Sequence, residues 1–503
     1  MKKFLTWVGL VIVMALFIGI ALLTIGVNIP LPIYTQHEQP TPRLIIQNCT
    51  LIDVIKGVAR PNRTLVIDNG RITRIDSGAT GPWPGYTVID GAGKYAMPAL
   101  WDMHLHTLSL SPQLHFPLLI ANGITNVRDM GDGDSWISEF NDDFRKDKGT
   151  WEQRVSKENL LMPTIWESCS YHVEAIDGAD SVNYRQKVRE LVTRLKARHE
   201  PFVKLQLEDS ELPAPIFYEI QHQARQQQMK VLGHLSYNVS IDSVLANGYP
   251  TIEHAWALLP HFVRNKKRFE KDLDTKHYEL ANQDSVLTLA VLRNIAKYNT
   301  YYVPTHVASN RKEALVFDVN FRQNPLNRYV EGTQLGLWKL WAWLHTSGYD
   351  KPAQQQILMD YYRRGLTVTR LAHQNGVQIL AGTDALDRYV YHGFSLHDEL
   401  GELAKAGLTN ADILRTATLN PARYYNQTTS NGSLEPGNVA NFILLRANPL
   451  ANIANTQTIE AVYTNQRLYN GADLAQMKAF VQEQAQSFAV RCRFIWNMLK
   501  GIV

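Results

Sequence analysis

The stretch YAMPALWDMHLH, residues 95–106, combines a short apolar strand pattern with two histidines at its carboxyl end. His104 and His106 are two residues apart, so in an extended strand their side chains point to the same side. Neutral imidazole is a good ligand for zinc and similar divalent ions. The pair therefore indicates the start of a metal site, although two histidines also occur in strands by chance.

Residues of metal-ligand type recur at the ends of later strand candidates. FVKLQL carries Lys204, VLGHLS carries His234, PTIEHA carries His254 and ILAGTDA carries Asp384. Amphipathic stretches such as YRQKVRELVTRLKARH lie between most of the strand candidates. Eight such units in series predict an α/β fold, a closed parallel (β/α)8 TIM barrel. Active sites of these barrels lie at the carboxyl ends of the strands, so the set favours a metal centre over unrelated polar residues.

Short-strand patterns flank the predicted barrel on both sides. LIIQNCTLIDV and TLVIDNGRITRI precede it, and NFILLRANP and IEAVYTNQRLYN follow it. We expect residues 43–96 and 426–471 to form one small β-sandwich built from both chain ends. The barrel would span residues 97–425, and a C-terminal helix would cover residues 472–503.

The N-terminus is predicted to lie outside the globular fold. FLTWVGLVIVMALFIGIALLTIGV begins at Phe4, contains no charged residue and follows Lys2 and Lys3. This stretch is long enough for a helix that crosses a bilayer. We expect residues 1–36 to be an uncleaved transmembrane anchor of a bacterial inner membrane, with the catalytic part on the periplasmic side. A cleaved signal peptide, which would give a secreted protein, is the alternative.

Composition limits the classes of partner. The formal net charge is only +4 and is spread along the chain, which argues against nucleic acid. The three cysteines form no CxxC pair, so a thiolate zinc site is not expected and unpaired thiols are. We expect a small-molecule substrate and a membrane as partners, and the sequence leaves the oligomeric state open.

Two further segments each have two interpretations. The insertion at residues 310–358 contains LGLWKLWAWL, whose tryptophans Trp338, Trp341 and Trp343 indicate helix packing or a lid that faces the substrate or the membrane. The C-terminal stretch AFVQEQAQSFAVRCRFIWNMLKGIV is predicted to be helical, basic and aromatic. It would pack on the barrel or form an interfacial helix beside the anchor.

The motifs together resemble a known family. In order and spacing the chain resembles the amidohydrolase superfamily, especially its prolidase-like and imidazolonepropionase-like members, over YAMPALWDMHLH, GITNVRDMG, FVKLQL, VLGHLS, TIEHA, AGTDA, ATLNPARYY and GSLEPGNVANFILLRANPL. The resemblance runs from about Leu44 to Asn470. It implies a metal-dependent hydrolase on a barrel. It does not imply the substrate, because this scaffold hosts many reactions.

The resemblance also implies a role for each ligand. Two divalent ions, expected to be Zn²⁺, would be bound by His104, His106 and Asp384 on one side, by His234 and His254 on the other, and by Lys204 as a bridging carbamate. Paired metal ions lower the pKa of a bound water. The resemblance implies that the bridging hydroxide attacks the substrate while Asp384 moves its proton to the leaving group.

Three more residues are candidates for contact with the substrate. His172, in ESCSYH, matches a histidine that prolidase-like members use to steady the developing oxyanion, although the residues before it are not the usual glycines. Tyr237 lies one place beyond the position, here Ser236, at which those members carry a carboxylate-binding tyrosine. Arg128, at the end of the second strand candidate, is the third.

We expect a hydrolase that cleaves an amide-type C–N bond in a dipeptide, an N-acyl amino acid or a cyclic amide. A mononuclear deaminase is a competing hypothesis. Deaminases of this superfamily usually carry HxxE after the fifth strand, however, and Tyr237 stands at the position of that glutamate. The sequence also leaves open a lactone or phosphotriester hydrolase and a non-enzymatic, membrane-tethered binding module.

Overall fold

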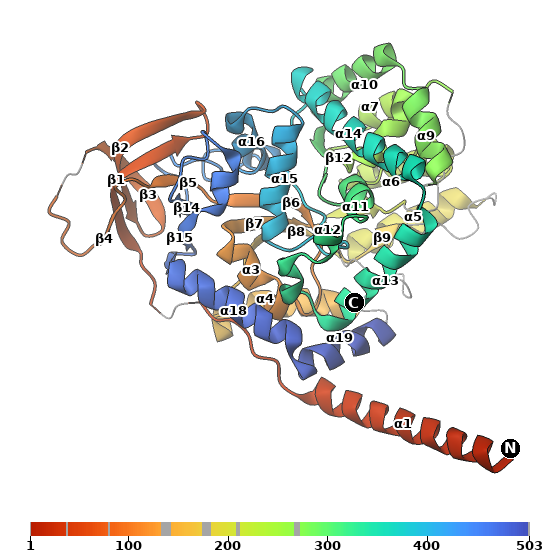
Figure 1. Ribbon diagram of the computed structural model, residues 1–503. Helices are drawn as coiled ribbons and strands as arrows, with labels where there is room; N and C mark the ends of the chain where they lie inside the picture. The colour runs from red at the N-terminus through yellow and green to blue at the C-terminus, as the bar shows by residue number, and fades with distance from the viewer. Residues whose placement is uncertain are drawn as a thin grey trace.

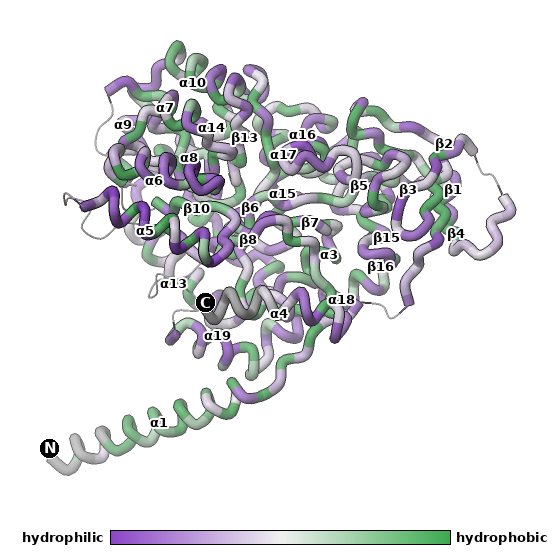
Figure 2. Tube along the Cα trace, turned by 180° about the vertical axis from the view of Figure 1, so that it is seen from behind, coloured by the Kyte–Doolittle hydropathy of each residue, from purple (hydrophilic) through white to green (hydrophobic). Residues whose placement is uncertain are grey.

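The computed structural model describes residues 2–36, 39–78, 81–131, 142–173, 183–207, 212–265 and 272–500. A helix-covered body carries an eight-stranded sheet on one side, and the N-terminal helix α1 (Lys2–Asn28) projects away from it (Figure 1). Figure 2 shows that α1 is hydrophobic along most of its length. Its segment Leu10–Asn28 is long and apolar enough to cross a membrane, and most of its residues are exposed.

Both ends of the chain meet in one mixed sheet with the strand order β16-β15-β14-β5-β1-β2-β3, in which β4 pairs with β1. The strands are β1 (Arg43–Asp53), β2 (Val58–Asp68), β3 (Arg71–Ser77), β4 (Thr87–Asp90), β5 (Tyr95–Pro98), β14 (Phe442–Leu445), β15 (Ile459–Thr464) and β16 (Arg467–Asn470). β5 pairs antiparallel with β14, and Met97 lies opposite Ile443. The two β-rich ends therefore meet in one continuous sheet and not in the two packed sheets of a sandwich.

The middle of the chain forms parallel strands in the order expected for the barrel. One sheet contains β6 (Leu100–Leu105), β7 (Ile124–Asp129) and β8 (Thr164–Ser168). The other contains β9 (His172–Val173), β10 (Phe202–Leu205), β11 (Lys230–Gly233), β12 (Thr251–Glu253) and β13 (Tyr301–Val303).

The segment 379–385 connects these two sheets on one side. Leu380 N donates to Tyr302 O of β13, and Met103 N of β6 donates to Ala381 O. On the other side, no ladder pairs β8 with β9 within the described ranges, and the chain passes from one to the other through residues 169–171. The parallel strands expected for the barrel are thus present in two joined sheets, but among the described residues their hydrogen-bonded ladder does not close, so the closed barrel is not confirmed.

Helices cover the outside of these strands (Figure 1). They are α2 (Ser111–Leu114), α3 (Phe116–Ala121), α4 (Asp142–Glu158), α5 (Tyr184–Ala197), α6 (Ala214–Gln226), α7 (Ile241–Ala246), α8 (Ala255–Leu258), α9 (Leu273–Ala281), α10 (Ser285–Lys297), α11 (Ser309–Leu315), α12 (Val319–Arg322), α13 (Gly332–Gly348), α14 (Pro352–Gln374), α15 (Phe394–Lys405), α16 (Asn410–Thr416) and α17 (Leu419–Tyr424). Helix α5 shows why they pack there, because it buries Val188, Val192 and Leu195 along one stripe.

The C-terminal stretch forms two helices, α18 (Gly471–Gln486) and α19 (Phe488–Lys500), in place of the single helix expected. Asn470 and Asp473 form a capping box that starts α18. Ser487 has an extended backbone conformation and separates the two helices. Helix α19 lies against α1. All three cysteines are free, as expected, and they are buried.

Gly233, the residue before His234, has a backbone conformation that only glycine adopts readily. Its φ is +115°, and a Cβ there would overlap the carbonyl oxygen of Leu205 on the neighbouring strand. We predict that Gly233→Ala lowers the free energy of unfolding by about 3 kcal/mol, because strain and overlap add. Thermal unfolding of the variant measures this loss.

Gly401→Ala in α15 is the matched control. A Cβ at Gly401 meets nothing within 4 Å. The control should keep or raise stability by up to about 1 kcal/mol, because alanine favours the helix. Equal unfolding temperatures for the two variants would contradict the strained conformation at Gly233.

Candidate metal centre

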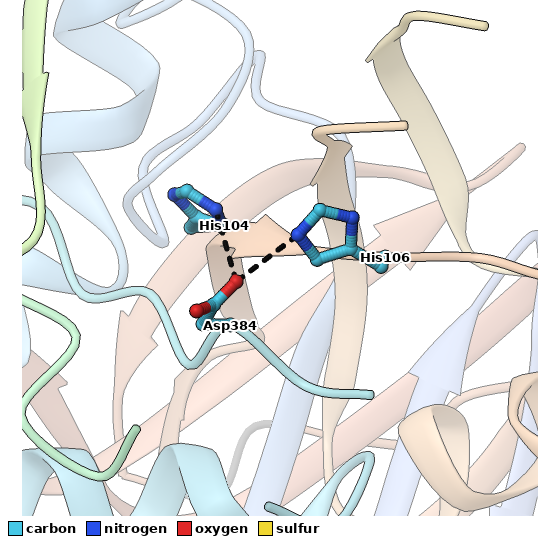
Figure 3. A group of neighbouring side chains, drawn as sticks. All are labelled: His104, His106 and Asp384. Atoms are coloured by element: carbon cyan, nitrogen blue, oxygen red, sulfur yellow. Dashed lines mark hydrogen bonds and ion pairs between the residues drawn. The ribbon is translucent and has the colours of Figure 1, made fainter. Parts of the chain in front are cut away.

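His104 and His106 lie at the carboxyl end of β6, and the segment 379–385 brings Asp384 to them (Figure 3). Asp384 Oδ1 lies 3.2 Å from His104 Nε2 and 3.0 Å from His106 Nε2. The backbone N of Asp384 donates to the carbonyl oxygen of His104 at 2.6 Å. Each ring therefore points its Nε2 atom toward Oδ1 of Asp384. The three side chains form a group able to bind a metal ion.

The outer nitrogens of these two rings are held by acceptors. His104 Nδ1 lies 2.8 Å from Glu253 Oε2, and His106 Nδ1 lies 2.8 Å from the carbonyl oxygen of Gly131. When each Nδ1 carries the proton and donates it, the lone pair of each Nε2 faces the cluster. His104 Nε2 is buried and makes no hydrogen bond with any described residue. A buried nitrogen in this state fits a divalent cation.

His234 and His254 flank this cluster. His254 follows β12, and its Nδ1 lies 3.8 Å from Asp384 Oδ2 and 2.7 Å from Thr305 Oγ1. The ring centroids of His234 and His254 are 4.8 Å apart. His234 Nδ1 accepts a hydrogen bond from the backbone N of Leu207 at 3.0 Å. Both predicted ligands are thus near the cluster, each with Nδ1 bonded to a neighbouring group.

Lys204 lies in β10 and is 1% exposed. Burial lowers the pKa of its amine, although the charges of Cys169 and Asp384 act in the opposite direction. Burial likewise lowers the pKa of His106, and the positive charge of Lys204 adds to this effect. The lowered pKa makes the neutral amine easier to reach, and the neutral amine is the form that ligates a metal or reacts with CO₂.

Glu253 is a functional residue that the sequence interpretation missed. Its two oxygens bond to different partners, Oε2 to His104 Nδ1 at 2.8 Å and Oε1 to Arg128 Nη2 at 2.7 Å. Burial raises its pKa, but the charge of Arg128 and the bond to His104 hold the pKa at about 2. TIEHA contains this carboxylate directly before His254, and that position was the available signal.

Arg128 is placed differently from the prediction of a substrate contact. It is fully buried, its Nε donates to the carbonyl oxygen of Met103 at 2.6 Å, and its Nη2 bonds Glu253. A side chain with these partners and no exposure orients Glu253 behind the metal cluster and does not touch a substrate.

Two more carboxylates anchor the ends of the strands. Asp102 Oδ2 accepts from Thr383 Oγ1 at 2.7 Å, and its Oδ1 accepts from Thr383 N at 3.1 Å. Burial raises the pKa of Asp102 to about 7, although the bonds from Thr383 lower it. Asp129 accepts from Thr107 Oγ1 at 2.7 Å and from Ser168 Oγ at 2.5 Å. Asp102 thereby ties the residue before Asp384 to β6, and Asp129 ties β7 to its neighbours.

His172 lies beside the cluster, with its ring centroid 6.3 Å from that of His106. Its Nε2 is 3.2 Å from the carbonyl oxygen of Met130. Tyr237 is 9% exposed and follows β11. Trp256, which the sequence interpretation did not single out, stacks on His254 with ring centroids 5.6 Å apart and an interplanar angle of 11°. His172 and Trp256 are thus close neighbours of the predicted ligands.

The amidohydrolase family model matches residues 95–467, most of the chain and all of the cluster just described. The chain belongs to the amidohydrolase family. As a member it is a metal-dependent hydrolase that acts on carbon–nitrogen bonds. The family predicted from the motifs is therefore confirmed.

Solved structures resemble this amidohydrolase along most of its length. Bottromycin amidohydrolase is 19% identical with a TM-score of 0.65, over 92% of this chain and 93% of that chain. A putative prolidase from Bifidobacterium longum is 19% identical with a TM-score of 0.61, over 88% and 100%. A Xaa-Pro dipeptidase with bound methionine in the active site is 16% identical with a TM-score of 0.59, over 85% and 100%. At these identities the likeness shows the fold alone. A comparison with curated proteins finds no match.

The bond between Glu253 and His104 predicts an effect on metal affinity. We expect Glu253→Gln to weaken binding of Zn²⁺ about 10- to 100-fold, because the proton on His104 Nδ1 loses its charged acceptor. Titration calorimetry with Zn²⁺ measures the change. Glu190→Gln, on the exposed surface of α5, is the control and should bind normally. Unchanged affinity in folded Glu253→Gln would exclude this role for Glu253.

Proposed function

We propose that this amidohydrolase is a binuclear enzyme that cleaves an amide-type C–N bond in a small molecule such as a dipeptide, an N-acyl amino acid or a cyclic amide. The convergence of His104 Nε2 and His106 Nε2 on Asp384 Oδ1 is the observation that carries the proposal. A cluster of this kind suits hydrolysis, because the chemistry needs an acidified water and a polarised carbonyl.

The proposed ligand set divides into two halves and a bridge. His104, His106 and Asp384 would hold one ion, His234 and His254 would hold the other, and Lys204 would bridge both as a carbamate. Nitrogen and carboxylate ligands favour Zn²⁺. Binding the second ion would require His234 or His254 to exchange its Nδ1 partner or to use Nε2. The rings are close enough to share one site, since the centroids of His104 and His254 are 4.7 Å apart.

Bound divalent ions would supply a Lewis acid for the substrate oxygen and a water of lowered pKa. The residues of the chain move the proton. Burial raises the pKa of Asp384, but His254 and His104 hold it well below its usual range, so the carboxylate stays ionised. Asp384 would accept a proton at Oδ1 or Oδ2 and pass it to the leaving nitrogen. His172 would donate to the developing oxyanion.

Aromatic and cationic side chains near Asp387, in the loop after Asp384, support a bulky or apolar substrate with an anionic end. Lys312 Nζ and the guanidinium of Arg388 lie 5.3 Å and 5.4 Å from the ring centroid of Trp341 in α13. Both cations also pair with Asp387. Because Ser236 occupies the place of the usual carboxylate-binding tyrosine, Arg388 is our candidate for that contact.

The compactness of the three-residue cluster favours a second candidate function. His104, His106 and Asp384 form the one group of this kind found among the described residues. A single ion bound there would suit a mononuclear deaminase. The metal stoichiometry separates this function from the binuclear one.

We predict that the purified protein binds about two equivalents of Zn²⁺ and hydrolyses N-acyl amino acids or dipeptides. Asp384→Asn should lower turnover by about 10³-fold while the protein stays folded, because the amide cannot accept the proton. Asp350→Asn, at an exposed position after α13, is the matched control and should retain full activity.

Three results would reject the proposal, each in a different way. One equivalent of metal with deamination would establish the mononuclear deaminase. Hydrolysis of lactones or phosphotriesters without any amide would overturn the C–N assignment and leave the site assignment intact. A protein that binds no metal and has no activity would be a binding module.

We also propose that α1 remains attached as a membrane anchor, with the body on the periplasmic side of a bacterial inner membrane. The contacts between α1 and α19 support retention. Cys492 Sγ donates to the carbonyl oxygen of Leu22 at 3.8 Å, and Arg493 donates to that of Val27. Lys2 and Lys3 before the apolar segment favour a cytoplasmic N-terminus.

Membrane fractionation tests the anchor. We predict that the protein, expressed in a Gram-negative bacterium, stays with the membrane pellet after an alkaline carbonate wash and keeps its N-terminal residues. A soluble protein whose mature N-terminus lies near Ile29 would show that the segment is a cleaved signal.

A further inference from the structure

Helix α1 meets the body at α19, which fixes the part of the body that lies closest to a membrane spanned by α1. At Gly26 the two helices approach so closely that a Cβ would overlap the side chain of Cys492. Arg493 caps the end of α1 by donating to the carbonyl oxygen of Val27. Residues of α19 therefore lie against the last turns of α1, where the chain would leave the bilayer.

Helix α19 also exposes large apolar side chains, which begin beside α1 at Phe488. Phe488, Trp496, Met498 and Leu499 are 47%, 38%, 37% and 67% exposed. Lys500 lies at the end of the helix and packs over the ring of Trp496, with Nζ 5.3 Å from the ring centroid. Apolar side chains with a basic residue beside them are the composition of helices that lie in the headgroup region of a membrane.

Helix α13 lies next to α19 (Figure 1). Glu331, which caps the start of α13, is buried and pairs with Arg491 of α19 at 3.3 Å. The buried side of α13 carries Gln334, Trp338 and Ala342. Trp338 packs on Tyr389 and Tyr391, with ring centroids 5.5 Å and 5.8 Å away. This side of α13 therefore packs on the loop that follows Asp384.

The outer side of α13 is apolar, whereas the solvent-facing side of a helix in a soluble protein is normally polar. Leu337, Leu340, Trp343 and Leu344 are 45%, 51%, 61% and 56% exposed. Their spacing of three and four residues places them on one face of the helix, which Lys339 borders. Four large apolar side chains on one exposed helix face mark an interaction surface.

We infer that the outer face of α13 and the exposed residues of α19 form a membrane-docking face, which inserts into the headgroup and acyl boundary of the bilayer that α1 spans. The inference rests on the proposed anchor. Continuity with α1 through α19 selects lipid as the occupant, because the bilayer must adjoin the end of α1. Docking would hold the loop that follows Asp384 one helix away from the membrane surface.

Quenching of bimane fluorescence by brominated lipid tests the docking face in the full chain, with bimane attached to one introduced cysteine at a time. The native cysteines are buried, with exposures of 0%, 0% and 5%, so an exposed introduced cysteine is labelled selectively. Leu340→Cys reports on the docking face. Leu16→Cys, 61% exposed on α1, reports on the anchor, and Val286→Cys, 70% exposed on α10, is the matched control on another surface. Each labelled protein is reconstituted in vesicles of phosphatidylcholine and phosphatidylglycerol, with and without brominated acyl chains.

We expect brominated lipid to quench bimane fluorescence at position 340 and at position 16 at least about twofold, and to leave position 286 unchanged. Quenching at 16 without quenching at 340 would overturn the docking face and leave the anchor intact, including the case in which a second copy covers α13. Quenching at neither position would overturn the anchor. Equal quenching at 340 and 286 would show nonspecific adsorption and overturn the docking face.

Discussion

The buried chain of contacts from Arg128 through Glu253 to His104 is the interaction on which the metal centre depends. It joins the consecutive strands β6 and β7 to β12, which lies far from them in the sequence. A carboxylate with no exposure is tolerated because a guanidinium bonds one oxygen and an imidazole the other. Removing Arg128 or Glu253 would leave an unpaired charge in the interior. The same contacts hold the proton on His104 Nδ1 and so direct Nε2 toward Asp384.

The segment 379–385 supplies the second constraint. It bonds to β13 at Leu380 and to β6 at Ala381, and Asp102 fixes Thr383 through two hydrogen bonds. These bonds fix the backbone before Asp384, and they thereby fix the position of Asp384. The short segment between the two sheets thus places the carboxylate of Asp384 against His104 and His106. Metal binding at this cluster depends on that placement. The helix that covers the loop after Asp384 also carries the exposed apolar face that we assign to the membrane.

Much of this arrangement follows from rules that act within single strands. The period of two along β6 predicted that His104 and His106 share a side, and the common end of parallel strands predicted that Asp384 would join them. The partner of Arg128 was beyond such rules. An arginine at the end of a strand has the same local pattern whether it faces substrate or a buried glutamate, and only the contact between β7 and β12 decides between them.

Other differences between the structure and the predictions from sequence also have local causes. One extended residue, Ser487, is enough to split the C-terminal helix, and no proline or glycine marks it. Between β8 and β9, the backbone N of Ser170 donates to the carboxylate of Glu200 and not to a neighbouring strand. In α13, tryptophans at positions 338 and 343 face opposite ways, so composition predicted both packing and exposure without saying which residue did which.

The most direct test of the metal centre is a crystal structure of the zinc-loaded protein with anomalous scattering data at the zinc edge. The account predicts two strong peaks between β6, β10, β12 and the segment 379–385. His104 Nε2 and His106 Nε2 would lie about 2.0–2.1 Å from the first ion, and Lys204 would be modified and lie between the two. Peaks away from Asp384, or an ordered cluster in which His104 Nε2 contacts no metal, would contradict it.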